Sequence, residues 1–192
     1  MNAIVLFFKN PRKGHVKGRL SQQIGEDKAL GVYNQLLLRT LKITRSLKKV
    51  HDVFYYCDEN ENVFDLDNFH VQEGGTLREH IKNAADKHLI DHDKVVLIPS
   101  DCFDLKADDL EEAFEKLDQF DVVFGPATDG GIYLIALKQE MDYLFEDIPI
   151  NSTQILHFMI DELTDKGMTY SLLETRIDVD TEEDLRHTDL SY

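Results

Sequence analysis

The stretch Val95-Val96-Leu97-Ile98-Pro99-Ser100-Asp101-Cys102-Phe103-Asp104 contains the clearest strand signal in the sequence and, directly after it, two carboxylates. Its first four residues form a short, uninterrupted apolar run, which predicts a strand that is buried on both faces. Such strands belong to parallel sheets, in which ligands bind in the crevice beyond the carboxyl ends of the strands. The polar residues from Ser100 onwards therefore fall where a functional site is expected.

Strands and helices alternate on both sides of this stretch. Residues 3–8 form another apolar run, ended by Lys9-Asn10-Pro11, and predict a second buried strand. Leucine and tyrosine recur at helical spacing from Leu30 to Leu41, which predicts a long helix over about 26–49. The remaining expected strands cover 53–56, 122–124 and 132–135. The remaining expected helices cover 76–89, 110–117, 155–163 and a short segment after Thr181, and a Thr76–Glu79 capping box opens the first of them.

This alternation predicts an α/β fold of Rossmann-like architecture, in which a mostly parallel, mixed sheet carries helices on both faces and right-handed crossovers join the strands. No linker, internal repeat or low-complexity tract divides the chain, so residues 1–192 are expected to form a single domain. The acidic stretch from Asp58 to Asp67 is expected to be an exposed loop.

Composition places the protein among globular proteins. The chain has 192 residues, 42% hydrophobic and 30% charged, with 10 glycines and 4 prolines, which excludes collagen-like and largely disordered proteins. No apolar run reaches the roughly 18 residues that a membrane helix needs, and the run at 3–8 is too short for a signal peptide. We therefore expect a cytoplasmic protein whose two cysteines, Cys57 and Cys102, are reduced.

Charge is distributed unevenly along the chain. The formal net charge of −16 argues against nucleic acid as a partner, because such binding neutralises phosphates with Lys and Arg. Residues 1–50 nevertheless hold eleven Lys or Arg against two acidic residues. Several of these bases lie between Lys9 and Arg19 with no acid among them, which indicates a local anion site.

The basic segment from Lys9 to Leu20 follows the first expected strand and contains two glycines. Glycines that permit close backbone approach, with cations on both sides, suit the phosphates of a nucleotide. The glycine spacing is neither that of a P-loop nor that of a dinucleotide-binding fingerprint. A solvated basic loop is the alternative interpretation, and charge alone does not separate the two.

Aspartates in two regions are candidate metal ligands. Asp101 and Asp104 lie three residues apart in a predicted turn and can converge on a divalent cation such as Mg²⁺. The alternative for Asp104 is a turn or capping role before the following helix. Asp180 precedes Thr181, which with Asp184 resembles a helix cap, so Asp180 either helps to start that helix or supplies a second carboxylate to the metal.

Other motifs carry less specific signals. Asp129-Gly130-Gly131 predicts a hairpin turn, although a substrate could approach these glycines closely. Gly74-Gly75 is either a loop or a set of backbone donors for an anion. Cys102 has no identifiable partner base, which favours a packed thiol over a nucleophile. His88 and His92 lack a second pair of ligands, so no zinc site is expected, and no Gly-x-Ser-x-Gly elbow supports a hydrolase triad.

Four stretches that follow one another along the chain form a combined pattern. They are Phe8-Lys9, Pro11, Gly14, Val16-Lys17 and Arg19-Leu20; Leu97 to Asp101 with Asp104-Leu105; Gly125-Pro126-Ala127, Asp129-Gly130-Gly131 and Tyr133-Leu134-Ile135; and Asp178-Val179-Asp180-Thr181 with Asp184-Leu185. Taken together they resemble a family of small bacterial GT-A-type proteins, called nucleotide-diphospho-sugar transferases or arsenosugar-biosynthesis glycosyltransferases and also a domain of unknown function. The resemblance covers almost the whole chain.

The same stretches also resemble nucleotide-transferring enzymes. Lys17-Gly18-Arg19-Leu20 is similar to a Lys-x-Arg-Leu motif of phospholactate guanylyltransferases, and the stretch from Asp178 to Leu185 is similar to a motif of molybdenum-cofactor guanylyltransferases. The chain departs from the first family in three places. Gly18 replaces a hydroxyl residue, Phe103 replaces a proline, and the usual tryptophan near Pro149 is absent, with Ile150-Asn151 in that region.

The resemblance implies a GT-A-like fold and a metal-dependent glycosyltransferase that uses a nucleotide-diphospho-sugar donor and a small-molecule acceptor, with Mg²⁺ or Mn²⁺ bridging the diphosphate. A nucleotidyltransferase acting on a nucleoside triphosphate and a small phosphorylated acceptor is the second hypothesis, and a non-catalytic nucleotide-binding protein is the third. The residues implied are Lys9, Gly14, Lys17 and Arg19 for the phosphates, Asp101, Asp180 and Asp104 for the metal, Asp101 and Asp129 for catalysis, and Gly130, Gly131 and Tyr133 for the substrate.

Overall fold

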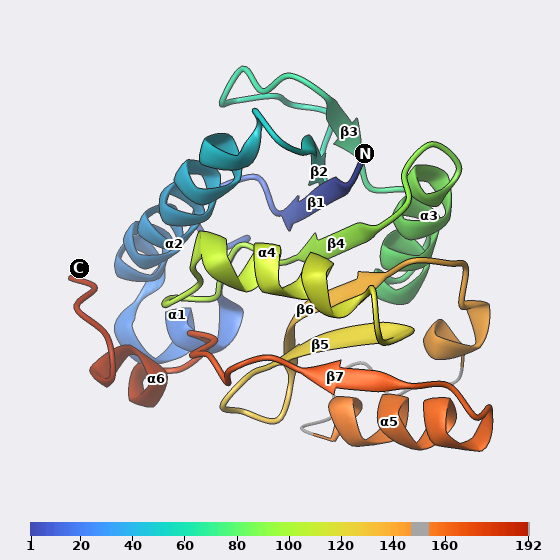
Figure 1. Cartoon of the computed structure of the whole chain (residues 1–192). Coiled ribbons are helices and arrows are strands. Elements are labelled where there is room, and N and C mark those ends of the chain that lie inside the picture. Colours follow the sequence, from blue (N-terminus) through green and yellow to red (C-terminus); the bar gives the residue numbers. More distant parts are fainter. Residues whose placement is uncertain (147–153, 192) are drawn as a thin grey trace.

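One sheet of seven strands forms the centre of the part of the chain that this computed structural model describes, residues 1–146 and 154–191 (Figure 1). The family departures at Pro149 and Ile150-Asn151 lie outside the described residues. The strands are β1 (Ala3–Phe8), β2 (Asp52–Cys57), β3 (Phe69–Val71), β4 (Val95–Ile98), β5 (Val122–Pro126), β6 (Ile132–Leu137) and β7 (Tyr170–Leu172). The helices are α1 (Gly18–Ile24), α2 (Glu26–Leu47), α3 (Leu77–Leu89), α4 (Ala107–Lys116), the 3-10 helix η1 (Asp142–Phe145), α5 (Ile155–Asp165) and α6 (Glu182–Arg186).

The strand order is β3-β2-β1-β4-β6-β5-β7. β1 pairs in parallel with β2 and β4, β2 with β3, and β5 with β7, whereas β6 runs antiparallel to β4 and β5. This topology confirms the predicted α/β class with a mostly parallel, mixed sheet. All residues of β1 and β4 are buried, which explains why both strands appear in the sequence as uninterrupted apolar runs.

Helices cover both faces of the sheet (Figure 1). On one face α2 and α4 contribute Leu37 and Leu110 to a core cluster, and on the other α3, η1 and α5 form a second cluster that contains Leu144 and Met159. α1 and α6 join α2 in a third cluster around Leu20. Cysteines 57 and 102 are both free and buried. Among the helices of the described residues, none has the length and apolar character needed to cross a membrane.

Local sequence signals do not reveal three of the short elements. β3 and β7 have three residues each and no alternating burial, so no apolar run marks them. α1 begins inside the basic segment from Lys9 to Leu20, for which the sequence predicts no helix. Its N-cap residue, Lys17, has a left-handed backbone (φ 50°) and no side-chain cap, so none of the usual capping residues signals the start of this helix.

Segments that are distant in the sequence meet at one edge of the sheet. β1 and β4 are adjacent and parallel, with Leu6 opposite Ile98, so the loops that follow them leave the sheet at the same edge. Because β6 runs antiparallel to its neighbours, the hairpin that precedes it lies at that edge too. β7 runs parallel to β5, so the segment after Leu172 also starts there. This is the edge at which α/β proteins bind their ligands.

An aromatic cluster with three histidines lies between β2, β3 and α3. His88 stacks on Phe54 with ring centroids 3.8 Å apart, and a 3.0 Å hydrogen bond joins its Nε2 to the Tyr56 hydroxyl. Burial, followed by the neighbouring His70 and His92, lowers the pKa of His88 to about 4. His88 is therefore a neutral core side chain at neutral pH.

We expect the wild type to lose about 2 kcal/mol more of its free energy of unfolding than the His88→Gln variant between pH 7 and pH 5. The unfolded chain protonates His88 near pH 6.5 but the folded protein only near pH 4, so over this range the proton favours the unfolded state and stability falls with the pH. Urea unfolding at the two pH values measures the difference. An equal loss in both proteins would show that another group is responsible.

Candidate active site

Backbone pairing brings the loop after β4 next to the segment before α6. The Val179 amide donates to the carbonyl of Asp101 (3.3 Å), and Cys102 lies opposite Asp178 in an antiparallel bridge. Val179 is fully buried. Since alternate residues of an extended segment point to opposite sides, burial of Val179 turns both Asp178 and Asp180 toward Asp101.

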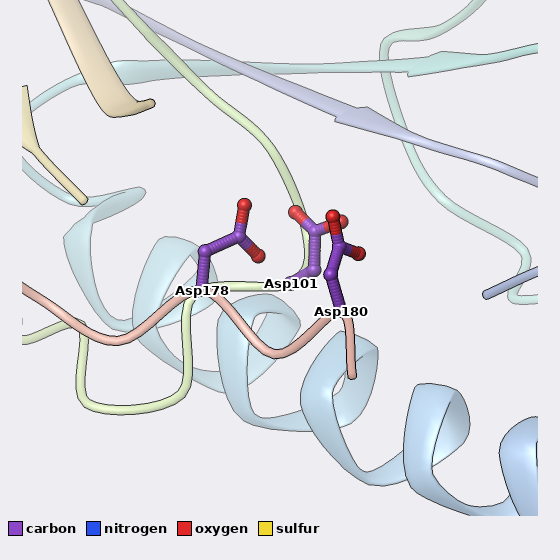
Figure 2. A group of neighbouring side chains, drawn as sticks. All are labelled: Asp101, Asp178 and Asp180. Carbon is purple, nitrogen blue, oxygen red and sulfur yellow. The ribbon is translucent and has the colours of Figure 1, made fainter. Parts of the chain in front are cut away.

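The carboxylates of Asp101, Asp178 and Asp180 form a compact group, which Figure 2 shows gathered on one side of the two chain segments. One oxygen from each lies within 4.8 Å of the other two. The side chains are 27%, 19% and 23% exposed, so the group remains open to solvent. Within the described residues, this is the one group of side chains that could supply three ligands to a metal ion.

The Lys17 side chain lies among these carboxylates. Its Nζ is 2.8 Å from Asp101 Oδ2, 2.9 Å from Asp180 Oδ1 and 3.8 Å from Asp178 Oδ1, and the side chain is only 3% exposed. Burial alone would lower the pKa of Lys17, but the three carboxylates raise it above its usual value. Lys17 is therefore a firmly held cation that contacts the carboxylates directly.

The aspartates of the group differ in ionisation. Burial acts to raise the pKa of Asp180, but Lys17 and the ion pair with Arg19 outweigh it and lower that pKa. At Asp178, burial and then the charge of Asp101 raise the pKa to about 8. Asp178 Oδ1 is also buried without a hydrogen-bond partner among the described residues. Such an oxygen is costly unless a proton or a cation compensates it.

Tyr33 fixes the start of the basic segment against the end of β4. Its hydroxyl accepts from the Lys9 amide (2.8 Å), donates to the Lys9 carbonyl (3.0 Å) and lies 3.2 Å from Ser100 Oγ. The Lys9 side chain is exposed. The structure thus brings Lys9, Lys17 and Arg19 to the same region, as the phosphate-binding hypothesis requires.

Other bases of this segment turn away from the carboxylates. Arg12 forms an ion pair with Glu59 of the acidic loop after β2, and Lys13 Nζ lies 2.8 Å from Asp27 Oδ2 in α2. A count of positive charges in the sequence therefore overstates how many cations a ligand could reach here.

Two further candidates, Gly14 and Asp104, lie outside the carboxylate group. Gly14 has a φ of 75°, and a Cβ there would come within 3.2 Å of Glu26 Oε1, so this glycine shapes a turn packed on α2. Asp104 Oδ1 accepts from the Ile177 amide (2.8 Å). Asp104 thus holds the segment that carries the other aspartates, rather than joining them.

The hairpin between β5 and β6 supplies Asp129. Its Oδ1 accepts from the Gly131 amide (2.8 Å), and Gly130 has the positive φ (87°) that a glycine turn adopts. The expectation that Tyr133 contacts a substrate needs correction. Its side chain is fully buried and its hydroxyl donates to the Glu174 carbonyl (3.0 Å). A register shift opposite Gly125 and Pro126 breaks the alternation along β6 and turns Tyr133 into the same core cluster as its neighbour Leu134.

Two cavities meet at the carboxylates. The larger, of about 570 Å³, also contains Asp129 and Gly131 in its lining, whereas Gly130 is not among its lining residues. The smaller, of about 290 Å³, lies beside the basic segment and is lined by Lys9 and Lys17. The residues that line both are Arg19, Leu77, Pro99, Asp101 and Asp180.

Sequence reasoning overlooked Asp178 as a member of the group. The signal was present in Asp178-Val179-Asp180, where an apolar residue between two aspartates is typical of an extended segment with one buried face. The capping pattern at Thr181 drew attention to Asp180 alone. That pattern is real: the Thr181 side chain accepts from the Asp184 amide at the start of α6.

The comparisons with known proteins agree with this architecture. A sequence model described as "Uncharacterized protein conserved in bacteria (DUF2064)" matches residues 55–152, which are 98 of the 192 residues. The chain belongs to the DUF2064 family. The matched part of this DUF2064 protein includes Asp101 and Asp129, and the family assignment confirms the resemblance to a bacterial domain of unknown function. No curated protein matches the chain.

Solved structures similar to the DUF2064 protein share its fold. One from Desulfovibrio desulfuricans G20, described as a "putative nucleotide-diphospho-sugar transferase", is 28% identical with a TM-score of 0.86, covering 95% of this chain and 84% of that one. The inositol-1-phosphate CTP transferase from T. maritima is 14% identical (TM-score 0.59; 95% and 90% covered), and Rv0371C from Mycobacterium tuberculosis H37Rv, in complex with manganese, is 12% identical (0.56; 97% and 96%). These likenesses confirm the nucleotidyltransferase and GT-A-like fold.

Proposed function

We propose that this DUF2064 protein is a metal-dependent glycosyltransferase that takes a nucleotide-diphospho-sugar as donor. The observation that supports it most is the meeting of three carboxylates with Lys17 and the exposed Arg19 at the ligand-binding edge of the sheet. The 28% identity to a protein described as a transferase of this kind supports the same class.

The residues fit a hard divalent cation. Mg²⁺ and Mn²⁺ prefer oxygen ligands, and Asp178 offers a buried oxygen that no described residue hydrogen-bonds. Asp101, Asp178 and Asp180 would hold the cation, whose chemistry when bound is to neutralise the charge that develops on the diphosphate leaving group. The manganese in the similarly folded Rv0371C is in line with such an ion.

Lys17 would exchange partners when the donor binds. Its ammonium now sits where the three carboxylates converge, so a cation there would displace it by charge repulsion. The released ammonium would then donate hydrogen bonds to the diphosphate of the donor. Arg19 and Lys9, which line the smaller cavity, would lie beside the same diphosphate. We therefore expect the cation and the nucleotide to bind cooperatively. The cation would release Lys17 for the diphosphate, and the diphosphate would keep Lys17 away from the carboxylates that hold the cation.

A nucleotidyltransferase is the second candidate function. The smaller cavity lies beside the basic segment, which would suit a triphosphate, and one protein of the same fold is a CTP transferase. In this reaction the same residues would grip a nucleoside triphosphate while a small phosphorylated acceptor attacks its α-phosphate.

A thermal-shift panel of nucleotide sugars and nucleoside triphosphates, each with and without Mn²⁺, tests the proposal. Mn²⁺-dependent stabilisation by a nucleotide sugar, but by no triphosphate, supports glycosyl transfer. The converse supports nucleotidyl transfer. Stabilisation without turnover of the bound nucleotide sugar across a panel of acceptors would favour a non-catalytic binding protein.

Replacing Lys17 with methionine is expected to strengthen binding of Mn²⁺ alone by about tenfold or more, because the competing ammonium is gone. The same variant should lose the cooperativity between Mn²⁺ and the nucleotide sugar. Electron paramagnetic resonance of free Mn²⁺ measures both effects.

Lys13→Met provides the matched control for this prediction. Lys13 lies in the same segment but pairs with Asp27, so its variant should bind Mn²⁺ like the wild type. Equal Mn²⁺ affinity in the Lys17 variant and the wild type would mean that Lys17 does not compete for the carboxylates.

A further inference from the structure

The larger cavity has an extensive apolar lining beside the carboxylates. Among the described residues, nine of the sixteen that line it are apolar, and they come from α3, β6, η1, α5 and the loop after β4. Leu77, at the start of α3, is 47% exposed and lines both cavities. The site therefore continues from a polar region into an apolar one.

This apolar lining is part of the hydrophobic core. Four of its members belong to the core cluster that α3, η1 and α5 build on the sheet, namely Ile135, Leu144, Phe145 and Met159, and three partly buried members, Ile81, Ile132 and Ile155, pack against that cluster. The volume of about 570 Å³ is typical of small-molecule sites, which span roughly 300–1,000 Å³. Because apolar surface in contact with water is unfavourable, a ligand with an apolar body would gain free energy by covering it.

Carboxylates outnumber bases in the lining of the cavity. Lys17 and Arg19 pair with Asp101, Asp178 and Asp180, so Asp129 is the lining carboxylate that these two bases do not contact. A phosphorylated acceptor would add negative charge beside it, which is unfavourable, whereas a neutral hydroxyl can donate to a carboxylate. The charged lining residues are Asp101, Asp129, Asp178 and Asp180 against Arg19 and Arg78.

Asp129 has an oxygen placed for such a hydroxyl. Its Oδ1 accepts from the Gly131 amide (2.8 Å), which fixes the carboxylate at the cavity lining. Its Oδ2 accepts no hydrogen bond from the residues that the structure describes. A hydroxyl that binds Oδ2 would therefore displace no hydrogen-bond donor of the described residues.

We propose that the larger cavity binds the acceptor and that this acceptor is an uncharged alcohol with an apolar alkyl or aryl body, whose hydroxyl donates to Asp129. The proposal rests on the proposed function in naming this ligand the acceptor. In the transfer, the hydroxyl oxygen forms the new bond to the sugar, the bond between the sugar and the diphosphate breaks, the nucleoside diphosphate leaves, and the hydroxyl proton passes to Asp129.

Methyl NMR of the full chain labelled with ¹³C at its four methionines tests this inference. Met159 lines the cavity, while Met1 is 68% exposed and serves as an internal reference. The probes are hexan-1-ol and hexyl phosphate, which share an alkyl chain and differ in charge. We expect hexan-1-ol to shift the Met159 methyl signal at concentrations at least about tenfold below those of hexyl phosphate.

Asp129→Asn should reduce the ratio between the concentrations of hexyl phosphate and hexan-1-ol that shift the Met159 signal. The substitution removes a negative charge but retains an oxygen for the Gly131 amide. Glu140→Gln removes an exposed carboxylate that does not line the cavity and should leave the preference unchanged. Equal or tighter binding of hexyl phosphate would overturn the proposal and favour a phosphorylated acceptor. No response of Met159 to either probe would also overturn it.

The outcome for the cavity is separable from that for the donor site. If a nucleotide sugar binds with Mn²⁺ but Met159 does not respond, the acceptor inference alone fails. If hexan-1-ol is preferred but no nucleotide sugar binds, the proposed function fails and the cavity remains a site for neutral apolar alcohols.

Discussion

Replacing Asp101 with asparagine is expected to weaken Mn²⁺-dependent binding of a nucleotide sugar at least about a hundredfold, equivalent to about 2.7 kcal/mol. Asp101 supplies one of three carboxylates whose oxygens lie within 4.8 Å of one another, and the affinity of an oxygen-ligand site depends strongly on the charge of its ligands. Mn²⁺ titrations with and without the nucleotide sugar measure the loss.

The ligand-free Asp101→Asn variant should keep its free energy of unfolding to within about 1 kcal/mol. Asparagine retains an oxygen for Lys17, which also keeps its 2.9 Å contact with Asp180, and removing one of three crowded negative charges relieves repulsion. Thermal unfolding without metal checks this point. A large destabilisation would make Asp101 a structural residue.

Asp104→Asn is the control for the same chemical change three residues away. Asp104 accepts from the Ile177 amide, and an asparagine oxygen can do the same. This variant should bind Mn²⁺ like the wild type. If it lost as much affinity as the Asp101 variant, the ligand set proposed here would be wrong.

Arg176→Met should destabilise the fold by about 3–5 kcal/mol, because it leaves the buried carboxylate of Asp109 without its partner. Arg176 and Asp109 are 5% and 4% exposed, and Nε and Nη2 of the guanidinium contact the two carboxylate oxygens at 3.1 and 2.7 Å. For a chain of this length the loss corresponds to a fall in Tm of roughly 6–20 °C. Thermal or urea unfolding measures it.

The double variant Arg176→Met with Asp109→Asn tests the reason for that loss. Asparagine removes the unpaired charge and can still accept from the Lys106 amide, as Asp109 does at 2.8 Å. We expect this protein to be more stable than the single variant. A double variant at least as unstable as the single one would show that lost packing, and not a buried charge, is the cause.

Arg186→Met is the control for the same change at an exposed ion pair. It should change the free energy of unfolding by no more than about 0.5 kcal/mol.

The same ion pair bears on the site, because Arg176 lies at the start of the segment that carries Asp178 and Asp180. Its backbone amide donates to the Pro126 carbonyl (3.0 Å), and its carbonyl accepts from the Thr128 amide (2.9 Å). Its side chain pairs with Asp109 at the start of α4, so Arg176 holds the segment between the hairpin and α4. The Arg176→Met variant should therefore also bind Mn²⁺ more weakly at temperatures where it remains folded.

Local sequence patterns predict the central strands and the longer helices of this fold. The apolar runs of β1 and β4 predict strands because both are buried on both faces, and the Thr76–Glu79 capping box marks the start of α3 where the structure has it. Lys17 gave no such mark for α1, since its left-handed backbone caps the helix without a side-chain bond.

The site could be predicted only in outline. Asp101 and Asp180 carry local signals as candidate ligands, but the participation of Asp178 depends on an antiparallel bridge to Cys102, which lies 76 positions earlier in the sequence. Tyr133 was misassigned because a register shift between β5 and β6 turns its side chain into the core, and no motif in the sequence encodes this shift. The contacts of Lys17 with aspartates from two distant segments likewise arise from tertiary structure.

The most direct test of the central claim is the position of manganese in crystals of this protein grown with Mn²⁺ and the nucleotide sugar that stabilises it most. We predict an anomalous scattering peak at coordination distance, about 2.0–2.3 Å, from oxygens of Asp101 and Asp180, with Lys17 Nζ moved onto a phosphate oxygen. A bound nucleotide with manganese elsewhere, or with Lys17 still between the two aspartates, would contradict the account.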